Sequence, residues 1–189
     1  MGNIQNVKDF YDKEVKKAIS TLMKCSYDDS NDKYLVKSEV ECFNYDKIKE
    51  HFFKTSIQSV DSLYFDISRN SLYFIEFRNC GPSKDLISIL KSKGVYSLLL
   101  YFSCMRYVDN YDYDTNNGIN LIYLAVLNKK KHSTAKFLEI AARNSGLQKN
   151  YYQSVIDELK SDRFQIFKKY DDVIVCYEDD FGNYIPNVN

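Results

Sequence analysis

The sequence of 189 residues lacks tryptophan and has only two prolines, six glycines and two histidines. So few prolines and glycines argue against long linkers and low-complexity segments. Two histidines are too few for a histidine-rich metal site. No apolar run reaches the ~18 residues of a membrane span, and the first 25 residues are charged throughout, unlike a signal peptide. We therefore expect a cytoplasmic protein without a membrane partner.

A charge excess of either sign is also absent, because 26 basic side chains balance 26 acidic ones. A dedicated non-specific nucleic-acid binder is usually basic overall, although a local basic patch stays compatible with neutrality. The five cysteines are widely spaced, odd in number and never form C-x-x-C, which argues against a disulfide scaffold or a zinc site. The 17 tyrosines carry little functional weight, since an AT-rich gene partly accounts for them.

The length suits one domain spanning residues 1–189. Apolar periodicity predicts an α/β protein with a mixed sheet and helices packed on it. Residues 119–128 form a nearly continuous apolar run, typical of a strand covered on both faces. Helices are expected at 4–24, 46–54 (N-cap Asp46), 84–107 (cap Ser83), 133–146 and 150–162, and strands at 33–45, in a hairpin at 59–79, at 119–128, at 163–170 and at 171–181.

The hairpin carries acids and a base at the open end of an otherwise apolar surface. A two-residue turn ending at Asn70, which tolerates positive φ, pairs Asp61 with Arg78. Because side chains alternate, Asp61 then shares a face with Glu76 and lies diagonal to it, whereas Asp66 points to the other face. Diagonal neighbours lie roughly 7–8 Å apart, close enough for both carboxylates to reach one Mg²⁺ ion. A surface ion pair without function is the alternative, and a three-residue loop would reverse the parity.

The stretch "VDSLYFDISRNSLYFIEFRN" resembles the acid, hairpin and E-x-K motif of the PD-(D/E)XK nuclease superfamily. The resemblance implies a restriction-endonuclease-like α-β-β-β-α-β core at about 4–128, followed by an α-α-β-β extension at about 129–189. It implies that Asp61 and Glu76 hold Mg²⁺ or Mn²⁺. In many members a glutamate on the first helix joins them, and Glu14 matches that position best, with Glu50 second.

One residue departs from the motif, because the lysine slot holds Arg78. Arginine can bind phosphate but cannot lose a proton to act as a base. Lys93 lies on the apolar stripe of the expected helix 84–107, with Leu90 and Ser97. Some family members recruit the lysine from this helix, so Lys93 is the candidate that would assist the attacking water. Snorkelling at the edge of a buried stripe is the structural alternative.

Two classes of function follow. In the first, the chain is a metal-dependent nuclease, and the basic run Lys129, Lys130 and Lys131 contacts the phosphate backbone. That run is otherwise an ordinary solvated loop. In the second, catalysis has lapsed, no cofactor is needed, and the chain binds a protein, as a toxin-neutralising immunity protein does. The acidic residues around the last strand would then face a basic partner or protect an edge strand.

Overall fold

The computed structural model describes residues 4–81, 83, 85–108, 111–112, 116–132, 155, 157–159, 161 and 168–186. Its helices are α1 (Ile4–Glu14), α2 (Leu22–Cys25), α3 (Tyr45–Phe52), α4 (Leu86–Met105) and α5 (Lys129–His132), with short 3₁₀ turns η1 (Lys16–Ala18), η2 (Asn116–Gly118) and η4 (Glu178–Asn183). Its strands are β1 (Ile19–Thr21), β2 (Tyr27–Asp28), β3 (Lys33–Tyr34), β4 (Glu41–Asn44), β5 (Ser62–Asp66), β6 (Ser71–Arg78), β7 (Asn120–Leu127) and β8 (Asp172–Tyr177).

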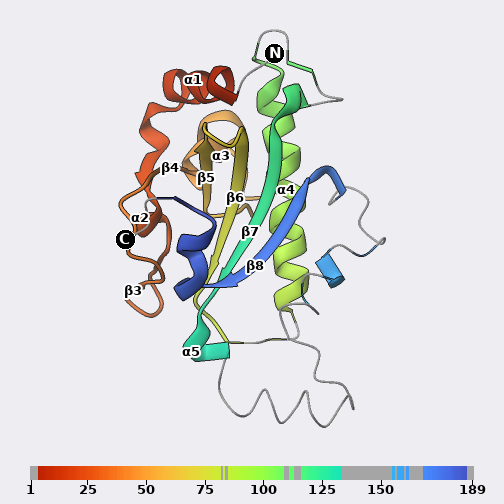
Figure 1. Cartoon of the computed structure of the whole chain (residues 1–189). Coiled ribbons are helices and arrows are strands. Elements are labelled where there is room, and N and C mark those ends of the chain that lie inside the picture. The colour runs from red at the N-terminus through yellow and green to blue at the C-terminus, as the bar shows by residue number, and fades with distance from the viewer. Residues whose placement is uncertain are drawn as a thin grey trace.

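Six of these strands form one mixed sheet in the order β1-β4-β5-β6-β7-β8 (Figure 1). The strands from β1 to β6 pair antiparallel, whereas β6, β7 and β8 run parallel to one another. The parallel step from β6 to β7 is connected through α4, as a parallel crossover requires. The protein is therefore a mixed α/β protein, as the sequence predicted.

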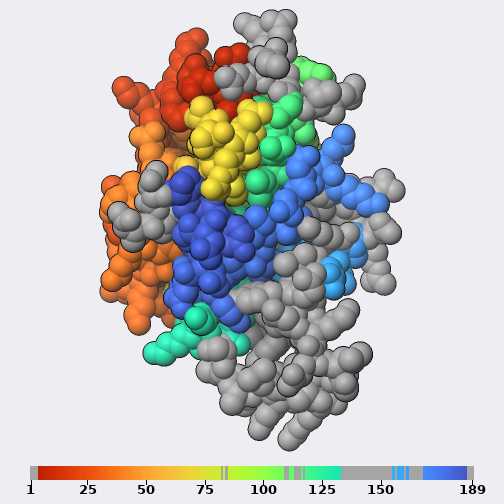
Figure 2. All heavy atoms as spheres, in the orientation of Figure 1, coloured from red at the N-terminus to blue at the C-terminus, as the bar shows by residue number. Residues whose placement is uncertain are grey.

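The sheet has a hydrophobic core on each face. Helices α1, α3 and α4 cover one face, and their apolar residues form the larger core. Helix α2 and the C-terminal segment cover the other face with Leu22, Phe181 and Ile185. Figure 2 shows this C-terminal segment, in dark blue, beside the orange N-terminal part. Strand β7 contributes Tyr123 to the first core and Leu124 to the second, which confirms the prediction of a strand covered on both faces.

The N-terminal region differs from the prediction. The expected helix 4–24 ends at Glu14, and residues 19–21 form the edge strand β1. The β-branched Ile19 and Thr21 pair with β4 there, which favours an extended backbone over a helix. The expected strand 33–45 is divided between β3 and β4. Residues between them hydrogen-bond to the region around α2, as Val36 N–H does to the Ser26 hydroxyl at 3.1 Å.

Two helix caps were also predicted at the wrong residues. Asn44, not Asp46, caps α3, since its Oδ1 accepts the backbone N–H of Lys47 at 3.0 Å. Helix α4 begins after Asp85, and no side-chain cap bond forms there. The predicted inward stripe of α4 is confirmed, because Leu86, Leu90, Ser97, Tyr101 and Cys104 are all buried.

The last part of the chain is described incompletely. The predicted helix 133–146, most of the predicted helix 150–162 and residues 163–167 lie outside the described residues. The described end of the predicted strand 163–170, residues 168–170, is a turn and not a strand. The predicted strand 171–181 is confirmed over β8, which pairs with β7. Within the described ranges, α4 is the longest helix, and no helix has both the length and the apolarity needed to cross a bilayer.

Three buried tyrosines, one on α3, one on β7 and one just before β8, bind to α4. Each donates its hydroxyl to a main-chain carbonyl on the inner side of the helix. The bonds join Tyr123 to Leu90 at 2.9 Å, Tyr170 to Gly94 at 2.8 Å and Tyr45 to Ser97 at 2.5 Å. A buried tyrosine hydroxyl needs such a partner, because burying it without a hydrogen bond is costly.

Ser97 also anchors the loop that leads to the candidate site. Its hydroxyl accepts the N–H of the fully buried Val60 at 2.8 Å. Ser97→Ala would leave that N–H without its acceptor, and we expect a loss of about 1–3 kcal/mol in the free energy of unfolding, measured by urea denaturation. Ser103→Ala is the control, since its hydroxyl donates to Leu99 O within α4, and it should change stability by less than about 0.5 kcal/mol. Equal losses in both variants would contradict the anchoring role.

Candidate active site

The β5–β6 hairpin has the predicted facing but a different register. Its four-residue loop spans 67–70, with Asn70 at φ 49° as expected, and Asp66 pairs with Ser71. Each β5 residue thus pairs with a β6 residue two positions before the predicted partner, as Leu63 does with Phe74 instead of Glu76. Asp61 therefore does not pair with Arg78. Because a shift of two keeps the parity, Glu76 still points toward α4, and Asp66 points to the other face.

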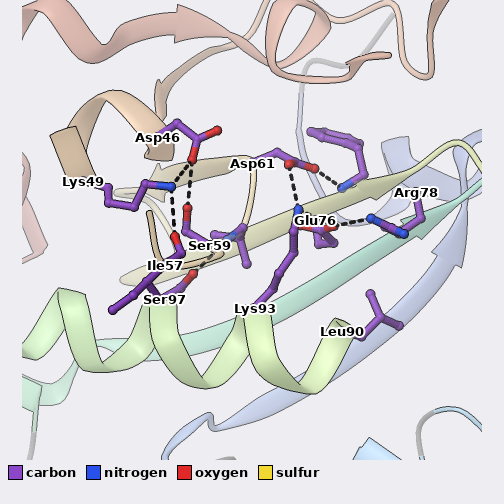
Figure 3. Close-up of polar contacts among 12 residues, drawn as sticks. Asp46, Lys49, Ile57, Ser59, Asp61, Glu76, Arg78, Leu90, Lys93 and Ser97 are labelled. Atoms are coloured by element: carbon purple, nitrogen blue, oxygen red, sulfur yellow. Dashed lines mark hydrogen bonds and ion pairs between the residues drawn. The ribbon is translucent and has the colours of Figure 1, made fainter. Parts of the chain in front are cut away.

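A polar network fixes the loop that carries Asp61. Asp46 on α3 accepts hydrogen bonds from Lys49 Nζ at 2.6 Å and from the Ser59 hydroxyl at 3.1 Å. Lys49 Nζ also donates to the carbonyl of Ile57 at 3.0 Å (Figure 3). Asp61 N–H then donates to Ile75 O at 3.0 Å, which places Asp61 at the start of β5 and beside β6.

Asp61, Glu76 and Lys93 meet from three different elements (Figure 3). Lys93 Nζ, which rises from α4, lies 2.8 Å from Glu76 Oε1 and 3.2 Å from Asp61 Oδ1. The second oxygen of Asp61 accepts the N–H of Phe77 at 2.6 Å. Glu76 is fully buried, whereas the side chains of Asp61 and Lys93 are 24% and 16% exposed. The two carboxylates therefore share one ammonium at the edge of solvent.

Arg78 completes the cluster from the end of β6. Its Nη1 lies 3.5 Å from Glu76 Oε1, and its side chain is 24% exposed. The Nε atom of Arg78 is buried and has no hydrogen-bond partner among the residues that the structure describes. All four residues that the sequence singled out on the hairpin and on α4 are thus brought together.

The electrostatics of this cluster favour a protonated Lys93. Burial lowers the pKa of the Lys93 ammonium, but the charges of Glu76 and Asp61 outweigh burial and raise it above its ordinary value. Burial raises the pKa of Glu76 to about 8, and the neighbouring charge of Asp61 adds to the rise. Burial also raises the pKa of Asp61, against the opposing effect of Lys93. Glu76 is therefore the group that changes its charge near neutral pH.

The raised pKa of Glu76 predicts a pH-dependent stability. Between pH 4.5 and about 8 the folded protein keeps this proton while the unfolded chain releases it. Stability should therefore fall as the pH rises through this window, by roughly 5 kcal/mol in total. Glu76→Gln cannot titrate and should lose most of this slope, which urea denaturation at pH 5, 6.5 and 8 would measure. Parallel pH profiles for the two proteins would contradict the assignment.

A pocket of about 390 Å³ opens beside the cluster, with Asp61, Arg78 and Lys93 in its wall. The remaining wall comes from the end of β6 and from the segment around β2: Cys25, Ser26, Tyr27, Asp28, Asp29, Ser30, Asn31, Phe77, Asn79 and Cys80. Asp28 accepts the Ser30 hydroxyl at 2.7 Å, a bond that lowers the pKa of Asp28. The sequence showed residues 26–32 only as a turn cluster, and nothing in their pattern pointed to the site.

A second groove, of about 580 Å³, shares Asn31 and Asn79 with this pocket. Among the described residues, its wall carries Lys33, Lys130 and Lys131 and no acidic side chain. Lys131 Nζ donates to Asn79 O at 2.6 Å and to Asn31 Oδ1 at 3.2 Å. The basic run from the sequence thus lies next to the candidate site.

Lys129, the third residue of that run, points elsewhere. Its Nζ lies 2.8 Å from Asp179 Oδ2, and its N–H donates to Glu178 Oε2 at 2.6 Å. The acidic segment after β8 therefore has an intramolecular basic partner.

The structure does not bring Glu14 to the cluster. Glu14 is exposed at the end of α1, 3.4 Å from Lys13 Nζ, in a groove with Phe52 and Tyr107. Glu50, the second candidate, is exposed on α3. Helical spacing places Glu14 on the same side of α1 as Tyr11. The helix ends at Glu14, however, so Tyr11 is buried in the core while Glu14 stays exposed.

The donor atoms of the cluster suit a hard cation in type, and the protein supplies two carboxylates. In the described part of the chain, no group of three or more carboxylate, cysteine or histidine side chains could hold a metal ion. Asp61 and Glu76 supply two carboxylates, and Mg²⁺ is commonly bound by one or two carboxylates plus waters. Over the described residues, the buried Glu76 Oε1 accepts no hydrogen bond, although Lys93 lies close to it.

A comparison of the chain with protein-family models, with curated proteins and with solved structures found no match. Support for a function therefore comes from the arrangement of the fold and the chemistry of the cluster.

Proposed function

We propose that the protein is a metal-dependent phosphodiesterase of the PD-(D/E)XK type that hydrolyses nucleic acid. One observation carries the proposal: Lys93 of α4 reaches between Asp61 and Glu76, at 3.2 and 2.8 Å. Two acids and a lysine are the residue types of the family motif, and here the lysine comes from the helix after the hairpin. Arg78 in the lysine slot is then compatible with activity, because Lys93 supplies the amine.

The order of elements supports the same proposal. After α1, strands β4, β5 and β6 form an antiparallel meander, α4 follows, and β7 pairs parallel with β6. This order is compatible with the α-β-β-β-α-β core of the proposed family, with η1, β1, α2, β2 and β3 inserted between α1 and β4 and α3 inserted between β4 and β5. Strands β1 and β8 extend the sheet at its two edges.

Asp61 and Glu76 are the residues that would hold Mg²⁺ or Mn²⁺. When bound, such an ion would stabilise charge on a phosphate and favour ionisation of a water. The raised pKa of Glu76 fits this role, since two buried acids beside each other favour any positive charge placed between them. In the structure that charge is the ammonium of Lys93.

The basic residues of the cluster have separate roles in the proposal. Lys93 carries a proton and lies at the pocket wall, so it can stabilise the negative charge of a phosphate or donate a proton to a leaving oxygen. Arg78 lies in the same wall, and its guanidinium can bind two phosphate oxygens. A water-activating role for Lys93 would first require loss of this proton.

The adjoining groove gives the polyanion a path to the site. Lys33, Lys130 and Lys131 lie in its wall, and it meets the pocket at Asn31 and Asn79. A nucleic-acid backbone placed there would lead its phosphates from the lysines to Arg78 and Lys93. The zero net charge of the whole chain does not oppose binding of this local kind.

This path predicts a salt-dependent binding defect. The double variant Lys130→Ala, Lys131→Ala should weaken binding of a fluorescent oligonucleotide and reduce the slope of log K against log salt by about 1–2. Lys129→Ala is the matched control, because Lys129 is paired with Asp179, and it should change the slope little. Equal effects of the two changes would contradict the path.

The activity itself is tested with the full chain and labelled single- and double-stranded DNA and RNA. We expect cleavage with Mg²⁺ or Mn²⁺, none with EDTA, and a loss of about 100-fold or more in Glu76→Gln. Asp66→Asn, on the opposite face of the same hairpin, should keep the activity. Calorimetry with Mn²⁺ on the wild type and on Glu76→Gln provides a second readout. If the wild type showed no cleavage and released no heat with Mn²⁺, the proposal would be refuted.

The same ion pairs support a second candidate. Lys93 satisfies both carboxylates without a metal, and this is what a nuclease fold whose catalysis has lapsed would keep. The chain would then bind another protein, as a toxin-neutralising immunity protein does. Absence of Mn²⁺ binding, together with recovery of one stoichiometric protein partner from the native host, would favour this candidate.

A further inference from the structure

Two buried cysteines face each other behind the wall of the site pocket. Cys25, at the end of α2, and Cys42, on β4, have their sulfur atoms 3.6 Å apart. Cys25 is 9% exposed and Cys42 is 2% exposed. A disulfide has a sulfur–sulfur distance of about 2.05 Å, so the two atoms would have to approach by about 1.5 Å.

The backbone around the pair already fixes the two elements to each other. Leu22 N–H donates to Val40 O at 3.0 Å, and Met23 N–H donates to Ser38 O at 2.8 Å. Helix α2 is thus bonded to the residues that lead into β4. The sulfurs can therefore approach through side-chain rotation and small shifts, without a rearrangement of the chain.

Cys25 is the sulfur that an oxidant can reach. It lines the 390 Å³ pocket, whereas Cys42 lies beneath it. The hydrogen bond from the Cys42 thiol lowers the pKa of Cys25 against the opposing effect of burial. A thiolate is the form of cysteine that reacts with peroxide, so Cys25 would react first and Cys42 second.

We propose that Cys25 and Cys42 form an intramolecular disulfide when the protein meets hydrogen peroxide. The Cys25 thiolate attacks one peroxide oxygen, the O–O bond breaks, and the departing hydroxide takes up a proton to form water. The sulfur of Cys42 then attacks the Cys25 sulfenic acid, the S–O bond breaks, and a second water leaves with the Cys42 proton. Two thiols are oxidised and one peroxide is reduced to two waters.

The bond would restrain the wall of the site pocket. It closes a ring from Cys25 to Cys42 that contains β2 and β3, including Asp28 and Asn31 of the pocket wall. The disulfide would hold this segment against β4 and reduce its motion. The inference goes beyond the proposed function and does not depend on it, because the thiol chemistry can be measured without any activity.

Peptide mapping of the oxidised full-length protein tests the inference. Trypsin places the five cysteines in five separate peptides, with Cys25 in "CSYDDSNDK" and Cys42 in "SEVECFNYDK". After peroxide treatment and blocking of free thiols, we expect these two peptides joined and the blocked cysteines reduced from five to three. Reduction with dithiothreitol should restore all five.

The variants Cys25→Ser and Cys42→Ser should each abolish the joined peptide. Cys80→Ser is the matched control, since Cys80 also lines the pocket, and it should leave the joined peptide unchanged. A joined peptide containing Cys25 and Cys80, or five free thiols after oxidation, would overturn the inference. The peptide map of the oxidised wild type is sufficient to test for the disulfide, even if a variant fails to fold.

Oxidation should also raise the melting temperature by roughly 5 °C, because a disulfide that closes a loop of this length restricts the unfolded chain. The rise should disappear on reduction and should be absent from Cys42→Ser. A lower melting temperature in the oxidised protein would mean that the bond strains the fold, which contradicts the approach by side-chain rotation.

Discussion

Replacing Lys93 by methionine is expected to cost about 3–5 kcal/mol of folding free energy at pH 9 and most of any cleavage activity. Methionine preserves the length of the side chain and removes its charge. Glu76, which is fully buried, and Asp61 would then face each other without a cation. The loss should shrink as the pH falls, because Glu76 can take up a proton, and its pKa, already raised by burial, rises further without Lys93.

A divalent cation should compensate part of the loss in Lys93→Met. Because the ammonium lies between the two carboxylates, its removal leaves a place that suits a positive charge. We expect Mn²⁺ to raise the melting temperature of this variant more than that of the wild type, while cleavage stays at least about 100-fold slower. Cation binding and catalysis would thereby be separated in one protein.

Lys91→Met is the matched control on the same helix. Lys91 is paired with Glu158 at 2.9 Å, and that carboxylate is 46% exposed and lies outside the pocket wall. We expect a smaller loss of stability, no response to Mn²⁺ beyond that of the wild type, and retained activity. Unchanged stability of Lys93→Met at pH 9 would show that the carboxylates do not depend on the ammonium.

Phe74→Ala is expected to destabilise the protein by about 3–5 kcal/mol. Phe74 is fully buried on β6, two residues before Glu76 on the same face. Its ring centre lies 5.3 Å from that of Tyr170 and 5.5 Å from that of Tyr101 on α4. The truncation would leave a cavity between the strand and the helix that together carry the cluster.

Urea denaturation measures the effect of Phe74→Ala, and Leu99→Ala is its control. Leu99 lies on α4 but is 45% exposed, so its truncation should change stability by about 0.5 kcal/mol or less. If the two truncations had similar effects, Phe74 would not hold strand and helix together as the structure indicates.

The sequence was sufficient for the parts of the fold and the site that depend on side-chain alternation. Asp61 was preferred to Asp66 because it shares a face with Glu76, and this holds although the true register differs by two residues. Lys93 was identified because it lies on the stripe of Leu90 and Ser97, and α4 follows that periodicity closely. In both cases a local repeat fixed the direction of the side chain.

The remaining parts depend on tertiary contacts that leave no local repeat. The apolar spacing of residues 4–24 fits a helix, yet pairing with β4 makes residues 19–21 a strand. Glu14 lies on the predicted side of α1, but the position of the helix on the sheet keeps it away from Asp61 and Glu76. The pocket wall around Asp28 depends on where a turn cluster packs, which the turn residues themselves do not specify.

The three tyrosine hydroxyls that bond to α4 have a consequence for the angle at which the helix is turned about its own axis. An apolar face permits some rotation of a helix about its axis, because apolar contacts are not directional. Hydrogen bonds to three carbonyls spread over about 10 Å of the helix do not permit it. Neighbouring residues of a helix point about 100° apart, so a roll of one position would carry Lys93 away from both acids. The three tyrosines therefore fix the rotation of α4 about its axis, and this keeps the Lys93 ammonium between the carboxylates of Asp61 and Glu76.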